Sequence, residues 1–170
     1  SLSAALIDMV VNLTDDSSLE KYHSKLIDKR KEALKLIDDD AESFNKVMDA
    51  FKMPKNNEEE KEKRTQAIQD ALYGASLTPL DTMKLGLNLM EIARKVIDKG
   101  NPNAVSDIGV AGLMGISAIK GAYLNVLINT QSLNDKEKAN KLESEADEIV
   151  AKAKKILSEI EEITINKIKS

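Results

Sequence analysis

The chain of 170 residues contains no cysteine and a single histidine, His23. The lack of cysteine excludes a disulfide framework, a zinc–thiolate site and a thiol nucleophile. One histidine cannot build a histidine-based metal cluster or a pair of histidine acid–base groups. Any chemistry on this chain is therefore expected to use carboxylate or amide groups, with no resident metal and no cofactor.

Aromatic residues, prolines and glycines are also scarce, with five, three and seven of each. Aliphatic side chains must therefore fill the core, and the abundance of Ala, Leu, Ile, Lys and Glu favours helices. The formal net charge of −4 disfavours a general nucleic-acid binder. The length fits one domain over residues 1–170, and no strand-like alternation is present. The sequence predicts an all-α fold.

Helix-breaking and capping residues divide the chain into about six helical segments. Ser17 and Glu20 form a capping-box pattern, and Pro79 suits the first position of a helix. Gly100 suits a helix C-terminus, and Asn134 with Glu137 is a second cap-like pair. The expected segments are 2–13, 17–53, 58–78, 79–100, 104–130 and a long last helix from about 134.

The fifth segment, 104–130, is hydrophobic on almost every side, so we expect it at the centre of a multihelical bundle. Its glycines lower its helical stability, which predicts that neighbouring helices approach it closely; they are Gly109, Gly112, Gly115 and Gly121. By composition it is also the nearest approach to a membrane span. Because Lys120 and Asn125 interrupt it, a buried helix is the favoured interpretation, in a cytoplasmic protein.

The last helix carries a narrow apolar seam with alternating spacings of four and three residues. Its members are Leu142, Ala146, Ile149, Ala153, Ile156, Ile160 and Ile163. Such a seam is typical of a helix with one long partner. The partner is either the second helix of the same chain or a second copy of the protein, and we predict a homodimer.

Asp40 is the most informative polar residue. At about 100° per residue it falls on the apolar face of the second helix, one turn from Ile37 and one turn from Phe44. A carboxylate that faces a core or cleft is costly unless it is paired, hydrogen-bonded or protonated. Two interpretations stand side by side: a structural, paired Asp, and a general acid or base.

A second polar set belongs to the fifth helix. Ser106 and Asp107 occupy its expected first turn, where capping is the simplest interpretation. Asn125 lies five turns after Asp107 and points in the same direction. An amide within so apolar a helix needs a partner, which is either protein or ligand.

Several short stretches, in order, resemble the formiminotetrahydrofolate cyclodeaminase family, which includes stand-alone methenyltetrahydrofolate cyclohydrolases. The order and spacing hold over residues 4–135. The stretches are Ala4–Thr14, Asp38–Phe44, Pro54–Lys55, Glu60–Lys61, Arg64–Gln69, Gly100–Asn101, Ser106–Asp107 and Gly121–Asn129. Two features of the family are reduced: its Gly-rich segment before the first helix is absent from the chain, and of its basic run only Lys21-Tyr22 is present.

The resemblance implies a single cyclodeaminase-like helical domain that dimerises and binds a folate in a cleft near the subunit interface. The family's catalytic Asp, in an Asp-x-Asp-Ala-x-x-Phe motif, falls on Asp40. Lys21 and Arg64 are candidates for the glutamate carboxylates of the folate. Candidates for hydrogen bonds to the pterin or the one-carbon unit are Asn101, Ser106, Asp107 and Asn125.

The implied activity is that of a folate cyclodeaminase, which converts 5-formiminotetrahydrofolate to 5,10-methenyltetrahydrofolate and ammonia. The alternative is a methenyltetrahydrofolate cyclohydrolase, which opens the methenyl bridge to 10-formyltetrahydrofolate. Both reactions take a tetrahydrofolate derivative as substrate, and one carboxylate serves either. A third interpretation, of another class, is a non-catalytic helical dimer or scaffold that kept the fold.

Overall fold

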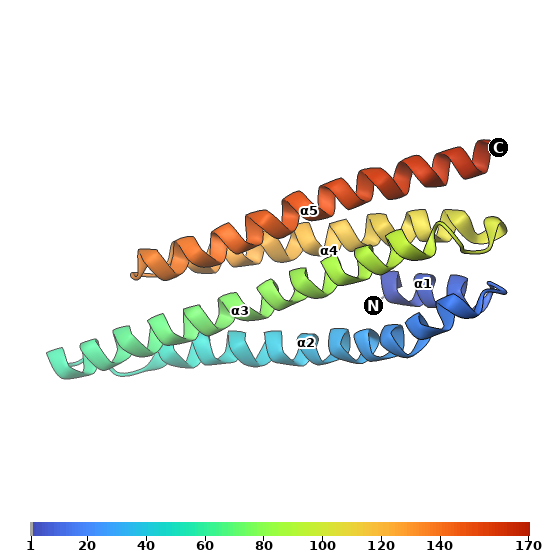
Figure 1. Cartoon of the computed structure of the whole chain (residues 1–170). Helices are drawn as coiled ribbons and strands as arrows, with labels where there is room; N and C mark the ends of the chain where they lie inside the picture. The colour runs from blue at the N-terminus through green and yellow to red at the C-terminus, as the bar shows by residue number, and fades with distance from the viewer. Residues whose placement is uncertain (1) are drawn as a thin grey trace.

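The computed structural model describes residues 2–170 and is shown in Figure 1. This part of the chain forms five α-helices, two short 3₁₀ turns and no strand. The helices are α1 (Leu2–Asn12), α2 (Glu20–Lys52), α3 (Glu58–Val96), α4 (Val105–Gln131) and α5 (Lys136–Lys169). The 3₁₀ turns are η1 (Ser17–Leu19) and η2 (Pro102–Ala104). The prediction of an all-α fold is confirmed.

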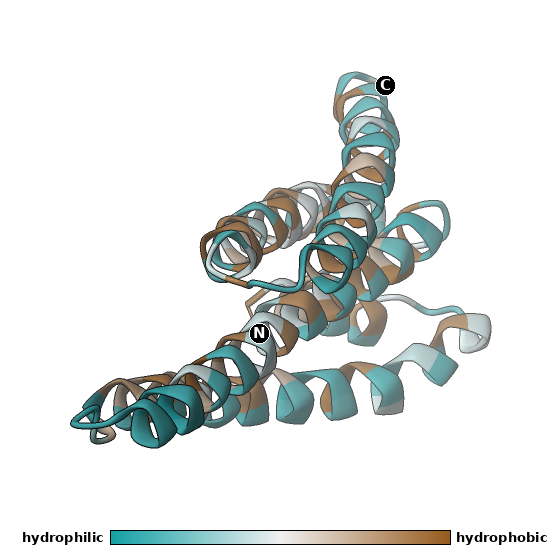
Figure 2. Cartoon of the chain, turned by 90° about the vertical axis from the view of Figure 1, so that its left-hand side faces the viewer, coloured by the Kyte–Doolittle hydropathy of each residue, from teal (hydrophilic) through white to brown (hydrophobic). Residues whose placement is uncertain are grey.

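Two long helical hairpins, α2–α3 and α4–α5, make up most of the molecule (Figure 1). Helix α3 packs against α2, α4 and α5, and the short α1 packs against α2, α3 and α4. The tip of the α2–α3 hairpin extends beyond the turn that joins α4 to α5 (Figure 1), and it is coloured as hydrophilic in Figure 2. One end of the α2–α3 hairpin therefore packs inside the bundle, and its other end projects from it.

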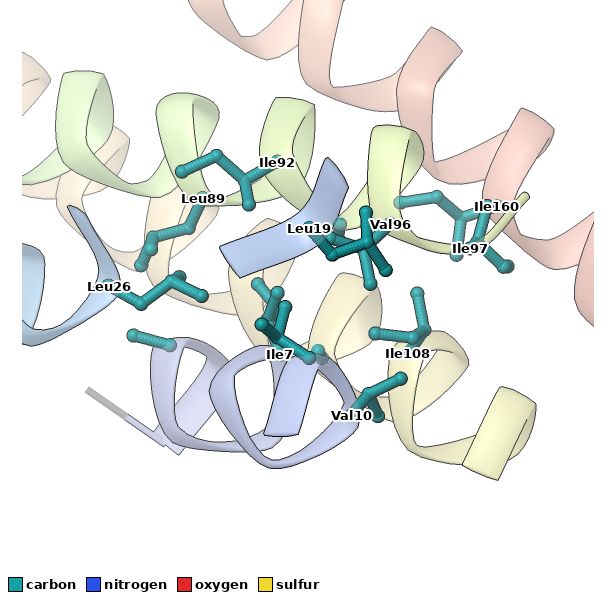
Figure 3. Packing of buried hydrophobic residues seen from close by; sticks show 14 of the residues in the cluster. Ile7, Val10, Leu19, Leu26, Leu89, Ile92, Val96, Ile97, Ile108 and Ile160 are labelled. Atoms are coloured by element: carbon teal, nitrogen blue, oxygen red, sulfur yellow. The ribbon is translucent and has the colours of Figure 1, made fainter. Parts of the chain in front are cut away.

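The core consists of two clusters of aliphatic side chains. One joins α1 to its three neighbours and includes Ile7, Leu26, Leu89 and Ile108 (Figure 3). The other joins α3, α4 and α5, and its fully buried members include Met83, Met90, Ile119, Val126 and Ala146. Helix α1 is about 16 Å long and α2 about 50 Å, so α1 covers only the first part of α2.

The predicted break at Pro79 is wrong, because α3 runs through it as one helix of 39 residues. A proline inside a helix removes one N–H donor and leaves the carbonyl four residues earlier without its partner. Here that carbonyl belongs to Ala75, and it accepts a hydrogen bond from the Asn129 side chain of α4 at 2.9 Å. A partner that is distant in sequence thus compensates for the proline, and the third and fourth expected segments become one helix.

Two of the expected helix starts are shifted by local capping. Asp16 accepts from the Ser18 N–H and begins η1 before α2, in place of a Ser17–Glu20 capping box. Asp135, and not Asn134, caps α5 by accepting from the Lys138 N–H at 3.0 Å. Both shifts follow from the acceptor strength of a carboxylate at a helix N-terminus.

Helix α4 packs against three other helices, as expected of a central helix, but it is not enclosed on every side. It packs on α1, α3 and α5, but a further face is exposed and includes Val110, Leu113, Leu124 and Ile128. By length and composition it could cross a membrane together with η2, although 39% of its apolar window is buried inside the protein. Its contacts with three other helices agree with its expected role as a bundle helix.

The expected close approaches to α4 occur at three of its four glycines. A Cβ on Gly109 would lie 3.0 Å from Thr164 Cγ2, and one on Gly112 would lie 3.3 Å from Ile160 Cγ2. A Cβ on Gly115 would lie 2.6 Å from Met90 Cγ. Gly121 has no such neighbour within 4 Å.

The apolar seam of α5 is occupied within the chain. Helix α5 packs against α4 and α3, and most of the seam is buried there: Leu142, Ala146, Ile149, Ala153 and Ile160. The Arg94 side chain of α3 also donates to Glu159 of α5 at 2.9 Å. The expectation that α2 or a second copy covers this seam is therefore wrong, because α4 and α3 already do.

Candidate functional site

A cleft of about 520 Å³ opens between α2, α3 and α4, next to the beginning of α1. It lies where α1 stops covering α2, so the groove between the longer helices is left unfilled. Most of its lining is aliphatic: Leu34, Leu36 and Ile37 from α2, Leu85 and Leu89 from α3, and Met114 and Ala118 from α4. A volume of this size is in the range of small-molecule sites.

Each of the four helices contributes one polar side chain to this cleft: Ser3, Asp40, Thr82 and Asn125. The Ser3 hydroxyl donates to the Ala111 carbonyl at 2.8 Å, and the Thr82 hydroxyl donates to the Thr78 carbonyl at 3.1 Å. Because each hydroxyl has only one proton, both oxygens can still accept from a ligand. The cleft thus combines apolar walls with a few convergent polar groups.

Asp40 lies on the α2 wall of this cleft and its side chain is exposed. Its apolar neighbours one turn away are exposed as well, with Ile37 at 65% and Phe44 at 61%. Of the apolar face that the sequence marked as a packing face, only Leu19, just before α2, and Leu26 are buried. Val47 is half-buried against the second core cluster, while the stretch from Ile37 to Phe44 is open because α1 is too short to reach it.

The ion pair nearest to Asp40 on α2 joins Lys35 to Asp39 and does not include the Asp40 carboxylate. Lys35 binds both carboxylate oxygens of Asp39, four residues later on the helix. The hydrogen bond to Asp39 raises the pKa of Lys35 above its usual value. The local cation is thus held by the neighbouring acid, and Asp40 stands among Ile37, Phe44 and the cleft.

Two glycines, Gly86 of α3 and Gly115 of α4, lie in the floor of the cleft. A Cβ on Gly86 would meet Ile119 Cγ1 at 2.7 Å, and one on Gly115 would meet Met90 Cγ at 2.6 Å. Small residues are therefore required here for α3 and α4 to approach each other. This approach closes the cleft at the bottom and gives it a firm floor.

Among the described residues, only Asp40 and Asn125 of the predicted site line this cleft. Arg64 is near the tip of the α2–α3 hairpin, where its Nε and Nη2 donate to the Phe51 carbonyl at 3.3 and 3.1 Å. Lys21 lies at the other end of α2, with its Nζ 5.2 Å from the centre of the Tyr22 ring. The structure gives Arg64 a capping role at the end of α2.

The remaining three predicted residues gather at the start of α4. Asn101 accepts from the Asn103 N–H at 3.0 Å and donates to the Leu13 carbonyl at 2.9 Å, so it caps η2 and ties it to α1. Ser106 and Asp107 are in the first turn of α4. Asp107 does share a face with Asn125, but five helical turns place the two about 27 Å apart.

Thr82 and Ser3 are cleft residues that the sequence did not indicate. Thr82 belongs to a row on α3 with helical spacing: Pro79, Thr82, Leu85, Gly86 and Leu89. All five residues lie within the expected segment 79–100, but Thr82 carries no charge and a lone threonine on a helix does not indicate a site, so the sequence did not single it out. Ser3 had no signal, since its role depends on the contact of α1 with α4.

A sequence model described as formiminotransferase-cyclodeaminase matches residues 1–148. The chain belongs to this family. The methenyltetrahydrofolate cyclohydrolase of Methylorubrum extorquens is 34% identical over 99% of this chain and 85% of its own length. The formimidoyltransferase-cyclodeaminase of Rattus norvegicus is 32% identical over 79% of this chain, which corresponds to 26% of that longer protein.

The family fold also matches in three dimensions. The crystal structure of formiminotetrahydrofolate cyclodeaminase from Thermotoga maritima superposes with a TM-score of 0.85. The superposition covers 96% of this chain and 82% of that one, at 24% sequence identity. The arrangement of helices that forms the cleft is thus a fold shared with a member of the same family.

Proposed function

We propose that this protein is a folate one-carbon enzyme that makes or opens the methenyl bridge of 5,10-methenyltetrahydrofolate. The observation that carries the proposal is the position of Asp40, whose exposed carboxylate lies on the apolar wall of a cleft of about 520 Å³. Family membership supports the substrate class, since the relatives named above are a folate cyclohydrolase and a cyclodeaminase. Apolar walls suit a pterin ring, and the polar groups of the cleft suit its N–H and carbonyl groups.

One candidate reaction is hydrolysis of the bridge. Water adds to the methenyl carbon and gives up a proton, and the bond from this carbon to N5 then breaks. N5 takes up a proton as this bond breaks, the hydroxyl on the former bridge carbon gives up its own proton to solvent as it becomes the formyl C=O, and 10-formyltetrahydrofolate is released. Asp40 would accept the proton of the attacking water and return one to N5. The Methylorubrum cyclohydrolase favours this reaction, because the match extends over most of both chains.

The other candidate is the cyclodeaminase reaction. N10 of 5-formiminotetrahydrofolate attacks the formimino carbon, and the tetrahedral intermediate loses ammonia to leave the methenyl bridge. Ammonia leaves only after its nitrogen has been protonated, and Asp40 would supply that proton. The names of the family and of the rat relative favour this reaction. In either reaction the same carboxylate moves one proton on the cleft side of α2.

Within the cleft we keep Asp40 and Asn125 from the predicted site. Asn125 lines the cleft from α4, whereas Asp40 lines it from α2. The Asn125 amide can both donate hydrogen bonds to a pterin and accept them from it. We add Thr82, whose oxygen can accept a hydrogen bond while its proton is held by Thr78. Lys21, Arg64, Asn101, Ser106 and Asp107 are left out of this cleft because they lie away from it.

We also propose that the protein is a cytoplasmic homodimer, and that a second copy covers the open faces beside the cleft. Large apolar side chains are exposed on both sides of its mouth: Leu34, Ile37 and Phe44 on α2, and Leu124 and Ile128 on α4. Each of these five is at least 60% exposed. Large exposed apolar side chains gathered on neighbouring helices mark interaction sites, and a two-fold axis lets one such surface cover itself.

The test follows the absorbance of 5,10-methenyltetrahydrofolate with purified protein and each substrate in turn. A cyclohydrolase accelerates its disappearance above the rate of spontaneous hydrolysis. A cyclodeaminase produces it from 5-formiminotetrahydrofolate together with one equivalent of ammonia. Absence of turnover with both substrates would overturn the enzyme proposal and favour the scaffold interpretation.

A further inference from the structure

Helix α3 passes through Pro79 in the wall of the cleft, and Pro79 is buried there. The proline has no N–H, so the Ala75 carbonyl lacks its intrahelical donor. Ala75 is buried with 8% of its surface exposed, so water cannot fully replace that donor. A buried carbonyl without a partner is costly, and something else must donate to it.

The donor is the side chain of Asn129, from the last turns of α4. Its Nδ2 lies 2.9 Å from the Ala75 oxygen, across 54 positions of sequence. The next residue, Thr130, is fully buried, and its hydroxyl lies 2.6 Å from Glu143 Oε1 of α5. The end of α4 is thus held on one side by α3 and on the other by α5.

Both ends of this contact lie close along their helices to a polar group of the cleft: Asn125 is one turn from Asn129, and Thr82 is two turns from Ala75. Thr82 follows Pro79 by three residues, and Asn125 precedes Asn129 by four. The hydrogen bond from Asn129 to Ala75 therefore ties the α3 wall to the α4 wall near these groups. Without it, α3 and α4 remain packed at Gly86 and Gly115, but the part of the α3 wall next to Pro79 loses its polar tie to α4.

We propose that Asn129 is a positioning residue for the folate reaction, and that it acts by replacing the hydrogen bond that Pro79 removes from α3. The inference rests on the proposed function for its kinetic part only. Its structural part, the energetic dependence of Asn129 on Pro79, is tested without any substrate.

The structural test is a double-mutant cycle with Asn129→Leu, Pro79→Ala and the double variant, measured by urea unfolding of the full chain. Asn129→Leu leaves the Ala75 carbonyl unpaired and lowers the folding equilibrium constant by roughly 10- to 100-fold. Pro79→Ala restores the intrahelical donor, so in that background the same change costs about threefold or less. If Asn129→Leu lowers the folding equilibrium constant by the same factor in both backgrounds, the inference is overturned.

Gln69→Leu is the matched control for this cycle. The Gln69 amide also donates to a carbonyl between elements, that of Ser132 at 3.1 Å, but no proline is involved. Gln69→Leu should therefore lower the folding equilibrium constant by the same factor whether residue 79 is Pro or Ala. A smaller loss in the Pro79→Ala background for Gln69→Leu as well would mean that the rescue is unspecific, and would overturn the inference.

The kinetic test uses whichever folate substrate the wild-type protein turns over, well below the melting temperature of every variant. We expect Asn129→Leu to lower kcat/KM by roughly tenfold, mostly through KM, and to do so by less than about twofold in the Pro79→Ala background. Gln69→Leu should leave KM unchanged. If the cycle shows coupling but KM of Asn129→Leu equals that of the wild type, the contact is structural only and the positioning role is overturned. If the wild type turns over no folate, the proposed function fails separately, while the cycle still decides the link to Pro79.

Discussion

At the scale of single residues, the site depends on which of three consecutive acids faces the cleft. Asp39 is bound by Lys35, Asp38 is exposed on the outer side, and only Asp40 lines the cleft. The helical periodicity of α2 alone makes this distinction, since neighbouring residues point about 100° apart. A change of one position in the sequence would move the carboxylate out of the site.

We predict that Asp40→Asn lowers the turnover rate by about 100-fold or more, because the amide cannot exchange a proton with the reacting nitrogen or water. Its thermal unfolding should be close to that of the wild type, since the Asp40 side chain is exposed. Asp38→Asn, with the same loss of charge two residues earlier, should keep wild-type turnover. Equal activity of the Asp40 and Asp38 variants would contradict the assignment.

At the scale of secondary-structure elements, α4 shows that glycines in one helix serve different purposes. Gly115 lets α3 approach, while Gly121 faces open space. Glycine lowers helix stability by about 1 kcal/mol relative to alanine at both positions. Whether a Gly→Ala substitution raises or lowers the free energy of unfolding therefore depends on the space around the new methyl group.

Gly115→Ala should lower the free energy of unfolding by up to about 2 kcal/mol, because the overlap with buried Met90 outweighs the gain in helix propensity. Gly121→Ala should raise it by up to about 1 kcal/mol. Chemical denaturation of the two variants checks both signs. A stabilising Gly115→Ala change would mean that α3 and α4 can separate at no cost.

The N-terminal caps of α3 and α5 differ in one chemical respect, because Asn57 caps the first and Asp135 the second. The Lys138 N–H that donates to Asp135 lowers the pKa of this carboxyl below its usual value. A lowered folded-state pKa means that the stabilisation is present above the ordinary aspartate pKa of about 3.9 and is lost as the pH falls through the folded value.

We therefore expect Asp135→Ala to lower the melting temperature at neutral pH and to have little effect once the wild-type carboxyl is protonated. Asn57→Ala, which removes a cap that does not titrate, should lower the melting temperature by a similar amount at every pH. Melting curves from pH 7 down to about pH 2 test the contrast. A pH-independent effect of Asp135→Ala would show that its charge contributes nothing to the cap.

At the scale of the whole molecule, the apolar faces of α2 and α4 beside the cleft are open, while the seam of α5 is filled. A homodimer built on the open faces predicts that Phe44→Glu and Leu124→Glu each convert the protein to a monomer in light scattering at micromolar concentration. Ile168→Glu, at the far end of α5 and 61% exposed, should leave the dimer intact. A wild-type monomer that retains activity would refute the dimer.

The sequence by itself determined the helical class, most helix boundaries and the face on which Asp40 lies. These properties depend on neighbours within about a turn, through periodicity, capping and the scarcity of strand-forming residues. The family was recognisable too, because its motifs are short and ordered along the chain. Asp40 and Asn125 could also be predicted as site residues, because each is a polar residue on an apolar helical face.

The tertiary structure alone decided the remainder. It carried α3 through Pro79 by a hydrogen bond from Asn129, it occupied the α5 seam with α4 and α3, and it left Arg64 at the tip of a hairpin. Each of these depends on a contact between residues far apart in sequence, or on how far one helix covers another. The cleft itself exists because α1 is shorter than α2, so local pattern could name its polar residues but not bring them together.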